Sequence, residues 1–91
     1  MTTSEFFFES VAALMDEISN DFEFNPEISD SGSDCYYRTT RSGRTDLTIN
    51  YTQEKVFIEH TSKQDDRIIH LEYRKPSKLR IQEISECVQH L

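Results

Sequence analysis

Glycine is scarce in this chain of 91 residues, which contains only Gly32 and Gly43. The phosphate-binding turns of nucleotide-binding proteins need several closely spaced glycines, because their backbone must approach the phosphates closely. Neither G-x-G-x-x-G nor the P-loop pattern occurs here, and the G-x-S-x-G turn of serine hydrolases is also absent. We therefore expect a protein that is not an enzyme and that uses no cofactor.

Cysteine and long apolar runs are scarce as well. The two cysteines, Cys35 and Cys87, lie 52 residues apart, far below the density of a disulfide-stapled secreted domain. We expect partly buried thiols, which behave as small apolar side chains. No apolar run approaches the roughly 18 residues that span a bilayer, and the N-terminus lacks the basic start of a signal peptide. The expectation is a cytoplasmic protein without membrane contact.

Basic residues are missing from the first part of the chain. No lysine or arginine precedes Arg38, whereas the remainder holds eight acidic and ten basic residues. Nine carboxylates lie in the first 37 residues: Glu5, Glu9, Asp16, Glu17, Asp21, Glu23, Glu27, Asp30 and Asp34. Such segregation creates a directed field that repels anions and attracts cationic protein surfaces. These nine residues are the predicted partner-binding site.

The N-terminal segment has the pattern of an amphipathic helix. Thr2 followed by Glu5 fits a capping box, and Asn25 before a proline ends the helix. Apolar residues recur between these signals at spacings of three and four: Phe7, Val11, Leu14, Ile18 and Phe22. The opposite face is predicted to carry four carboxylates: Glu5, Glu9, Asp16 and Glu23. A loop is expected from Asn25 to Asp34.

From Asp34 onward the apolar period changes to two, which is typical of strands with one buried face. Four strands are predicted: Cys35 to Arg41, Thr45 to Thr52, Lys55 to Ser62 and Arg67 to Arg74. Their connections are too short for crossovers, so successive strands must pair as antiparallel hairpins. By strict alternation Phe57 and Ile68 point away from the apolar face, either as ordinary surface residues or as part of a self-association patch.

A second helix follows the strands, with Ser77 as its N-cap. Its apolar stripe consists of Ile81, Ile84, Val88 and Leu91. The predicted fold is a single acidic α+β domain over residues 1–91, in the order α-β-β-β-β-α. It has two layers, with a four-stranded antiparallel meander and both helices on one face.

Metal and nucleic-acid sites have weak signals. His60 and His70 lie on neighbouring predicted strands, where a hairpin could pair their imidazoles near Glu59 or Glu72, but the spacing is nonspecific and we expect no metal site. Small basic clusters occur at Arg38, Arg41 and Arg44 and at Arg74, Lys75, Lys78 and Arg80. Phosphate binding would require the acidic segment to be turned away, so direct nucleic-acid binding is not expected.

The sequence also allows two other functions. The order helix, antiparallel sheet, helix with an acidic first helix resembles the frataxin family, which implies an iron-binding or metallochaperone domain, although this chain contains no tryptophan. A general adaptor that binds a protein by shape is the other alternative. In that case exposed apolar residues such as Phe57 and Ile68 would matter more than the charges.

The amount of negative charge suggests a further comparison. An exposed helix usually mixes both signs, whereas the predicted first helix has no cation. Residues 5 to 23 would rise about 27 Å, a length over which duplex DNA carries about 16 charges. Nine carboxylates are roughly the charge of one side of such a duplex.

In size, acidity and helix-sheet-helix order the chain resembles the small acidic DNA-mimic proteins of bacteriophages, in particular the Arn-type anti-restriction proteins of T-even phages. The resemblance implies a non-enzymatic inhibitor that occupies the DNA-binding site of a host restriction nuclease. It also implies a homodimer in the host-cell cytoplasm, with the nine carboxylates as phosphate surrogates. The ten basic residues downstream depart from a surface that would be acidic all round.

Overall fold

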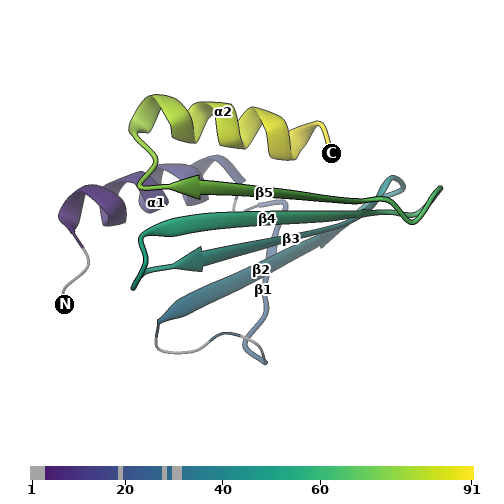
Figure 1. Ribbon diagram of the computed structural model, residues 1–91, viewed down its shortest axis with the longest axis horizontal. Coiled ribbons are helices and arrows are strands. Elements are labelled where there is room, and N and C mark those ends of the chain that lie inside the picture. Colours follow the sequence, from purple (N-terminus) through teal and green to yellow (C-terminus); the bar gives the residue numbers. More distant parts are fainter. Residues whose placement is uncertain (1–3, 19, 28, 30–31) are drawn as a thin grey trace.

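Two helices pack on one face of an antiparallel sheet in the computed structural model, which describes residues 4–18, 20–27, 29 and 32–91 (Figure 1). The elements are α1 (Glu5–Ile18), β1 (Glu23–Phe24), β2 (Ser33–Thr39), β3 (Gly43–Asn50), β4 (Lys55–Ser62), β5 (Ile68–Arg74) and α2 (Lys78–Gln89). The strands lie side by side in chain order, and each neighbouring pair is antiparallel. The predicted two-layer α+β class and the meander are confirmed.

The core lies between the sheet and the helices. In the middle of the sheet, strand alternation buries one face, with Leu47 and Ile49 on β3 and Val56 and Ile58 on β4. Both helices cover these side chains with their own apolar stripes: Phe7, Val11, Leu14 and Ile18 from α1, and Ile81, Ile84 and Val88 from α2. Burying this apolar surface is the main stabilising contribution to the fold.

The sheet has five strands, so the predicted four-stranded sheet is wrong by one strand. The additional strand, β1, comprises only Glu23 and Phe24, which pair with Tyr37 and Tyr36 of β2. Two residues cannot display an alternating pattern, so periodicity does not detect them. The pairing includes an edge-to-face contact between the Phe24 and Tyr36 rings, with centroids 5.4 Å apart.

The first helix is shorter than predicted, because it ends at Ile18 rather than continuing to Phe22. Phe22 is nevertheless buried, so its apolar character reflects packing of the following segment rather than helical periodicity. The start of α1 also differs from the prediction. The backbone N–H of Phe7 donates to Oγ of Ser4 at 3.3 Å, which makes Ser4 the N-cap. Thr2 of the predicted capping box lies outside the described residues.

The second helix agrees with its prediction. The backbone N–H of Arg80 donates to Oγ of Ser77 at 3.3 Å, so Ser77 is the N-cap. At the other end Nη2 of Arg38 donates to the backbone carbonyl of Val88 at 2.6 Å. A cation there satisfies a terminal carbonyl and complements the helix dipole. Neither helix in the described part of the chain is long and apolar enough to cross a membrane.

Phe57 and Ile68 lie on the face away from the helices, as predicted, because they pair with Glu72 and Thr61 in the register of β4 with β5. Phe57 is half-buried, whereas Ile68 is 61% exposed. The thiols also agree with expectation. Cys35 is buried, with the Thr48 hydroxyl 3.7 Å from its Sγ, and Cys87 is half-buried.

Candidate acidic binding surface

Four of the predicted site residues lie on α1 and are exposed: Glu5, Glu9, Asp16 and Glu17. We call them the α1 acidic face. At 100° per residue Glu5, Glu9 and Asp16 fall within about 40° of one another, opposite the buried stripe. Glu17 lies to one side of them. From Glu5 to Glu17 the helix rises about 18 Å.

The C-terminal end of this helix is electrostatically unfavourable. Asp16 and Glu17 lie in the last turn, which contains no basic residue. The backbone carbonyls there form the negative end of the helix dipole, so carboxylates are destabilising at this position and lysine or arginine would be stabilising. Stability therefore does not explain why these two residues are acidic.

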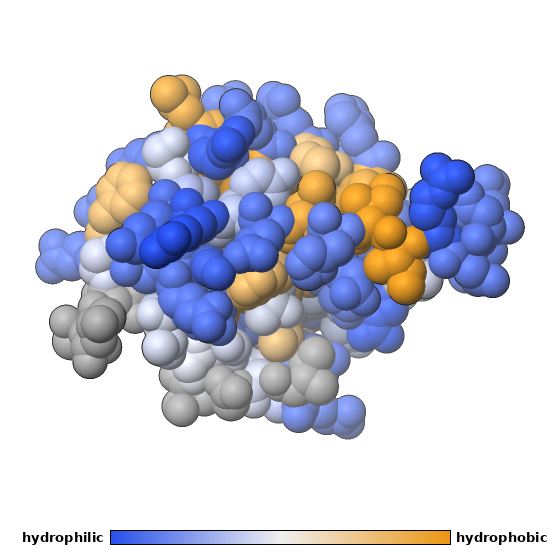
Figure 2. All heavy atoms as spheres, in the orientation of Figure 1, coloured by the Kyte–Doolittle hydropathy of each residue, from blue (hydrophilic) through white to orange (hydrophobic). Residues whose placement is uncertain are grey.

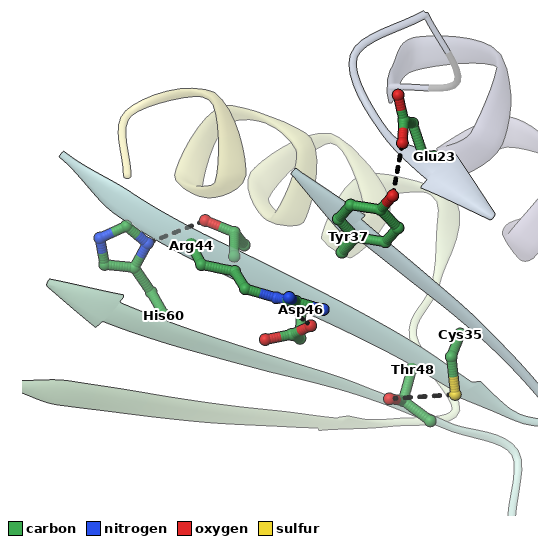
Figure 3. A network of polar contacts seen from close by, with 8 residues as sticks. Glu23, Cys35, Tyr37, Arg44, Asp46, Thr48 and His60 are labelled. Carbon is green, nitrogen blue, oxygen red and sulfur yellow. Dashed lines mark hydrogen bonds and ion pairs between the residues drawn. The ribbon is translucent and has the colours of Figure 1, made fainter. Parts of the chain in front are cut away.

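Three more acidic residues lie where the chain leaves α1 and enters the edge of the sheet: Asp21, Glu23 and Glu27. We call them the β1 acidic edge, and all three are exposed. The hydroxyl of Tyr37 donates to a Glu23 carboxylate oxygen at 2.5 Å (Figure 3). This hydrogen bond and the nearby carboxylate charge raise the pKa of Tyr37 above its ordinary value.

The β1 acidic edge does not continue the outer stripe of the helix. Glu23 shares a sheet face with Tyr37, which lies beside Asp46 on the side away from the helices. The prediction that Glu23 belongs to the helix stripe is therefore wrong, because α1 ends five residues earlier. The acidic residues form two groups joined by the segment that turns from α1 into β1.

The remaining two predicted residues are not part of either group. Asp34 lies on the helix-covered face of β2 and is half-buried, and the hydroxyl of Tyr51 donates to its Oδ2 at 2.8 Å. Burial and this hydrogen bond raise the pKa of Tyr51 well above its ordinary value. Asp34 thus has a structural partner. Asp30 lies outside the described residues.

Among the described residues, no ion pair joins either acidic group to a cation. Within residues 4–18, 20–27, 29 and 32–91 the ion pairs are Arg44–Asp46, Lys55–Glu72, Arg67–Asp65, His70–Glu59 and Arg80–Glu83. All of them join residues between Arg44 and Glu83. The acids of α1 therefore stay without an ion pair in the fold, whereas Arg38 and Arg44 line the same surface hollows as the β1 acidic edge.

The basic cluster near the first hairpin is engaged within the protein. Arg38 binds the end of α2, and its guanidinium lies 5.1 Å from the centre of the Phe22 ring. Arg44 lies 4.8 Å from the centre of the Tyr37 ring and donates from Nε to Asp46 at 3.1 Å (Figure 3). Cation–π and ion-pair contacts of this kind stabilise the sheet surface. These two arginines are thus less available for phosphates than the sequence suggested.

The possible pairing of His60 with His70 is wrong. His60 is opposite Ile69 in the register of β4 with β5, whereas His70 is opposite Glu59, so the two imidazoles lie on different sheet faces. His60 is buried, and its Nδ1 lies 2.8 Å from the Thr45 hydroxyl (Figure 3). In the part of the chain that the structure describes, no three His, Cys, Asp or Glu side chains gather as a metal site would require.

The candidate site is therefore a surface of exposed carboxylates that form no ion pair among the described residues. Comparison with known protein families, with characterised proteins and with solved structures finds no match for this chain.

Proposed function

We propose that this protein is a non-enzymatic inhibitor that binds a basic DNA-binding protein, such as a restriction nuclease, in place of DNA. The observation that carries the proposal is the set of seven exposed carboxylates in the α1 acidic face and the β1 acidic edge, without an ion-pair partner among the described residues. Lysine and arginine side chains that bind phosphates also form strong charge-assisted hydrogen bonds with carboxylates.

The charge density of the α1 acidic face is compatible with one side of a duplex. Over the approximately 18 Å from Glu5 to Glu17, duplex DNA carries about 11 charges, of which about half face one side. The helix presents four carboxylates over the same length. A basic groove that tracks phosphates would therefore meet a similar number of charges on α1.

The unfavourable position of Asp16 and Glu17 supports the same proposal. Two carboxylates at the negative end of a helix dipole lower stability. A partner with a positive surface would compensate this cost when it binds. The proposal thus explains a feature that folding alone does not.

An iron-binding function has less support from the described residues, since they offer no cluster of three potential metal ligands. Three of the four carboxylates of the α1 acidic face, Glu5, Glu9 and Asp16, also lie one turn or more apart along the helix. An adaptor that binds a protein by shape is the alternative function, and capture from a lysate distinguishes it from a DNA mimic.

The test is capture of proteins from a bacterial lysate on the immobilised protein, followed by elution with duplex DNA. One variant neutralises the α1 acidic face by the changes Glu5→Gln, Glu9→Gln, Asp16→Asn and Glu17→Gln. A matched control variant removes the same charge elsewhere by the changes Asp65→Asn, Asp66→Asn, Glu83→Gln and Glu86→Gln. We expect a DNA-binding protein to be retained, released by DNA and lost only with the first variant. Retention that is indifferent to DNA and to both variants would reject the mimic and favour the adaptor.

A further inference from the structure

The two edges of the sheet differ in length and protection. One edge is β1, with two residues, and the other is β5, which is seven residues long and, among the described residues, pairs on one side only, with β4. Natural proteins usually keep edge strands short or protect them with proline, lysine or bulges, because a long open edge can pair with another strand. Within Ile68–Arg74 there is no proline, lysine or glycine.

Apolar residues are exposed on this edge. Ile68 is 61% exposed and the neighbouring Ile69 is 39% exposed, although their side chains point to opposite faces. Hydrophobic atoms gather on the visible surface towards the β4–β5 hairpin, among mostly hydrophilic neighbours (Figure 2). The helices leave this end of β5 uncovered (Figure 1), so both side chains are accessible to a partner strand.

The backbone of β5 directs a regular set of hydrogen-bonding groups outward. The N–H of Ser62 donates to the carbonyl of Arg67 at 2.8 Å, and the N–H of Lys75 donates to the carbonyl of Glu54 at 2.7 Å. Successive residues of an antiparallel strand direct their backbone groups to alternate sides. The odd-numbered residues from 67 to 75 therefore face β4. The outward groups belong to the even-numbered residues Ile68, His70, Glu72 and Arg74.

We propose that β5 pairs antiparallel with β5 of a second copy of this chain, with Leu71 opposite the partner's Leu71. This register places His70 opposite the partner's Glu72 on one face. On the other face it places Ile69 opposite the partner's Tyr73, which extends the apolar side of the sheet. All seven residues of β5 are paired in this arrangement.

Neighbouring registers are less favourable. Residues that lie opposite each other must share a sheet face. The sum of the two residue numbers in each pair can therefore change only by an even number. Centring the pair on Glu72 would place two carboxylates opposite each other and His70 opposite the partner's Arg74. Centring it on His70 would oppose two imidazoles and leave Tyr73 and Arg74 outside the ladder. The register centred on Leu71 therefore avoids opposed like polar groups and pairs the whole of β5.

The same register satisfies the outward backbone groups. The residues that face the open edge are those that meet as hydrogen-bonded pairs: Ile68 with the partner's Arg74, and His70 with the partner's Glu72, each formed twice by symmetry. Each such pair exchanges two hydrogen bonds. The product is a continuous ten-stranded sheet with four helices on one face. This inference does not depend on the proposed function, because no other protein takes part.

The first test measures the mass of the protein in solution by sedimentation over a range of concentrations. We expect a dimer that His70→Pro weakens at least about tenfold, because proline removes an N–H that faces the open edge and not β4. The control is His70→Ala, which keeps that N–H and should remain dimeric. Circular dichroism establishes whether each variant is folded. A wild-type monomer at high concentration, or a dimer that folded His70→Pro leaves unchanged, would overturn the proposal.

The second test reads the register by cross-linking and does not use the proline variant. In a Cys87→Ser background, oxidation of Leu71→Cys should give a covalent dimer, since the two new thiols meet at the symmetry axis. The matched variant Ile69→Cys should not, because its thiols would lie about 14 Å apart along the strands. Efficient cross-linking of Ile69→Cys with none for Leu71→Cys would reject this register.

Discussion

The acidic end of α1 allows a direct test of the electrostatic reasoning, through the change Glu17→Lys. Glu17 is exposed in the last helical turn, without a basic neighbour in that turn. The substitution replaces an unfavourable interaction with the helix dipole by a favourable one, and each such interaction contributes about 0.3–1 kcal/mol at an exposed site. We expect the free energy of unfolding to rise by about 1 kcal/mol. For a domain of this size the melting temperature should rise by about 4–8 °C.

The measurement is urea unfolding followed by circular dichroism, at low salt and in 1 M NaCl. The control is Glu5→Lys, the same charge change in the first turn of the same helix, which should lower stability because a cation there opposes the dipole. Both effects should shrink in 1 M NaCl, where the screening length is about 3 Å. If the two variants shift stability in the same direction, or if salt leaves the difference intact, the dipole argument is refuted.

Two further predictions concern the sheet. Gly43→Ala should destabilise the protein by about 3 kcal/mol in urea unfolding, because Gly43 has a φ of 148° and an added Cβ would lie 2.0 Å from the backbone oxygen of Thr61. Stability should also fall as the pH rises above about 10, where tyrosine ionises in the unfolded chain while Tyr51, with its raised pKa, keeps its proton in the fold. The decline should be shallower in Tyr51→Phe, as measured by urea unfolding between pH 9 and 11.

The alternating pattern of apolar residues predicted most of the sheet. The bounds of β4, Lys55 to Ser62, were predicted without error, because buried residues alternate with more exposed ones from Lys55 to Thr61. The strand β2 was predicted two residues too late, from Cys35 to Arg41. Ser33 and Asp34 are polar, and they belong to the strand only through pairing with β3. The two-residue β1 depends on the same tertiary pairing, so local sequence cannot reveal it.

The exposed acidic residues of α1 were predicted from helical periodicity, which depends only on residues close together in sequence. The arrangement of the acidic residues that follow α1 could not be predicted in this way. Glu23 turns to the far face of the sheet through its pairing with Tyr37, and Asp34 turns inward to meet Tyr51 from a distant strand. Both orientations follow from strand pairing between residues far apart in sequence. Arg38 is a similar case, because it binds the carbonyl of Val88, 50 residues away.

The two proposals together predict how many partner molecules a dimer binds. In a sheet joined through β5, the two β1 strands lie at opposite ends, separated by nine inter-strand spacings or about 43 Å. The two β1 acidic edges would therefore act as separate sites. We expect light scattering of the purified complex to give one partner molecule per protomer, with folded His70→Pro binding at an unchanged affinity per site. A single partner per dimer, with affinity lost in His70→Pro, would mean instead that both acidic surfaces engage one partner together.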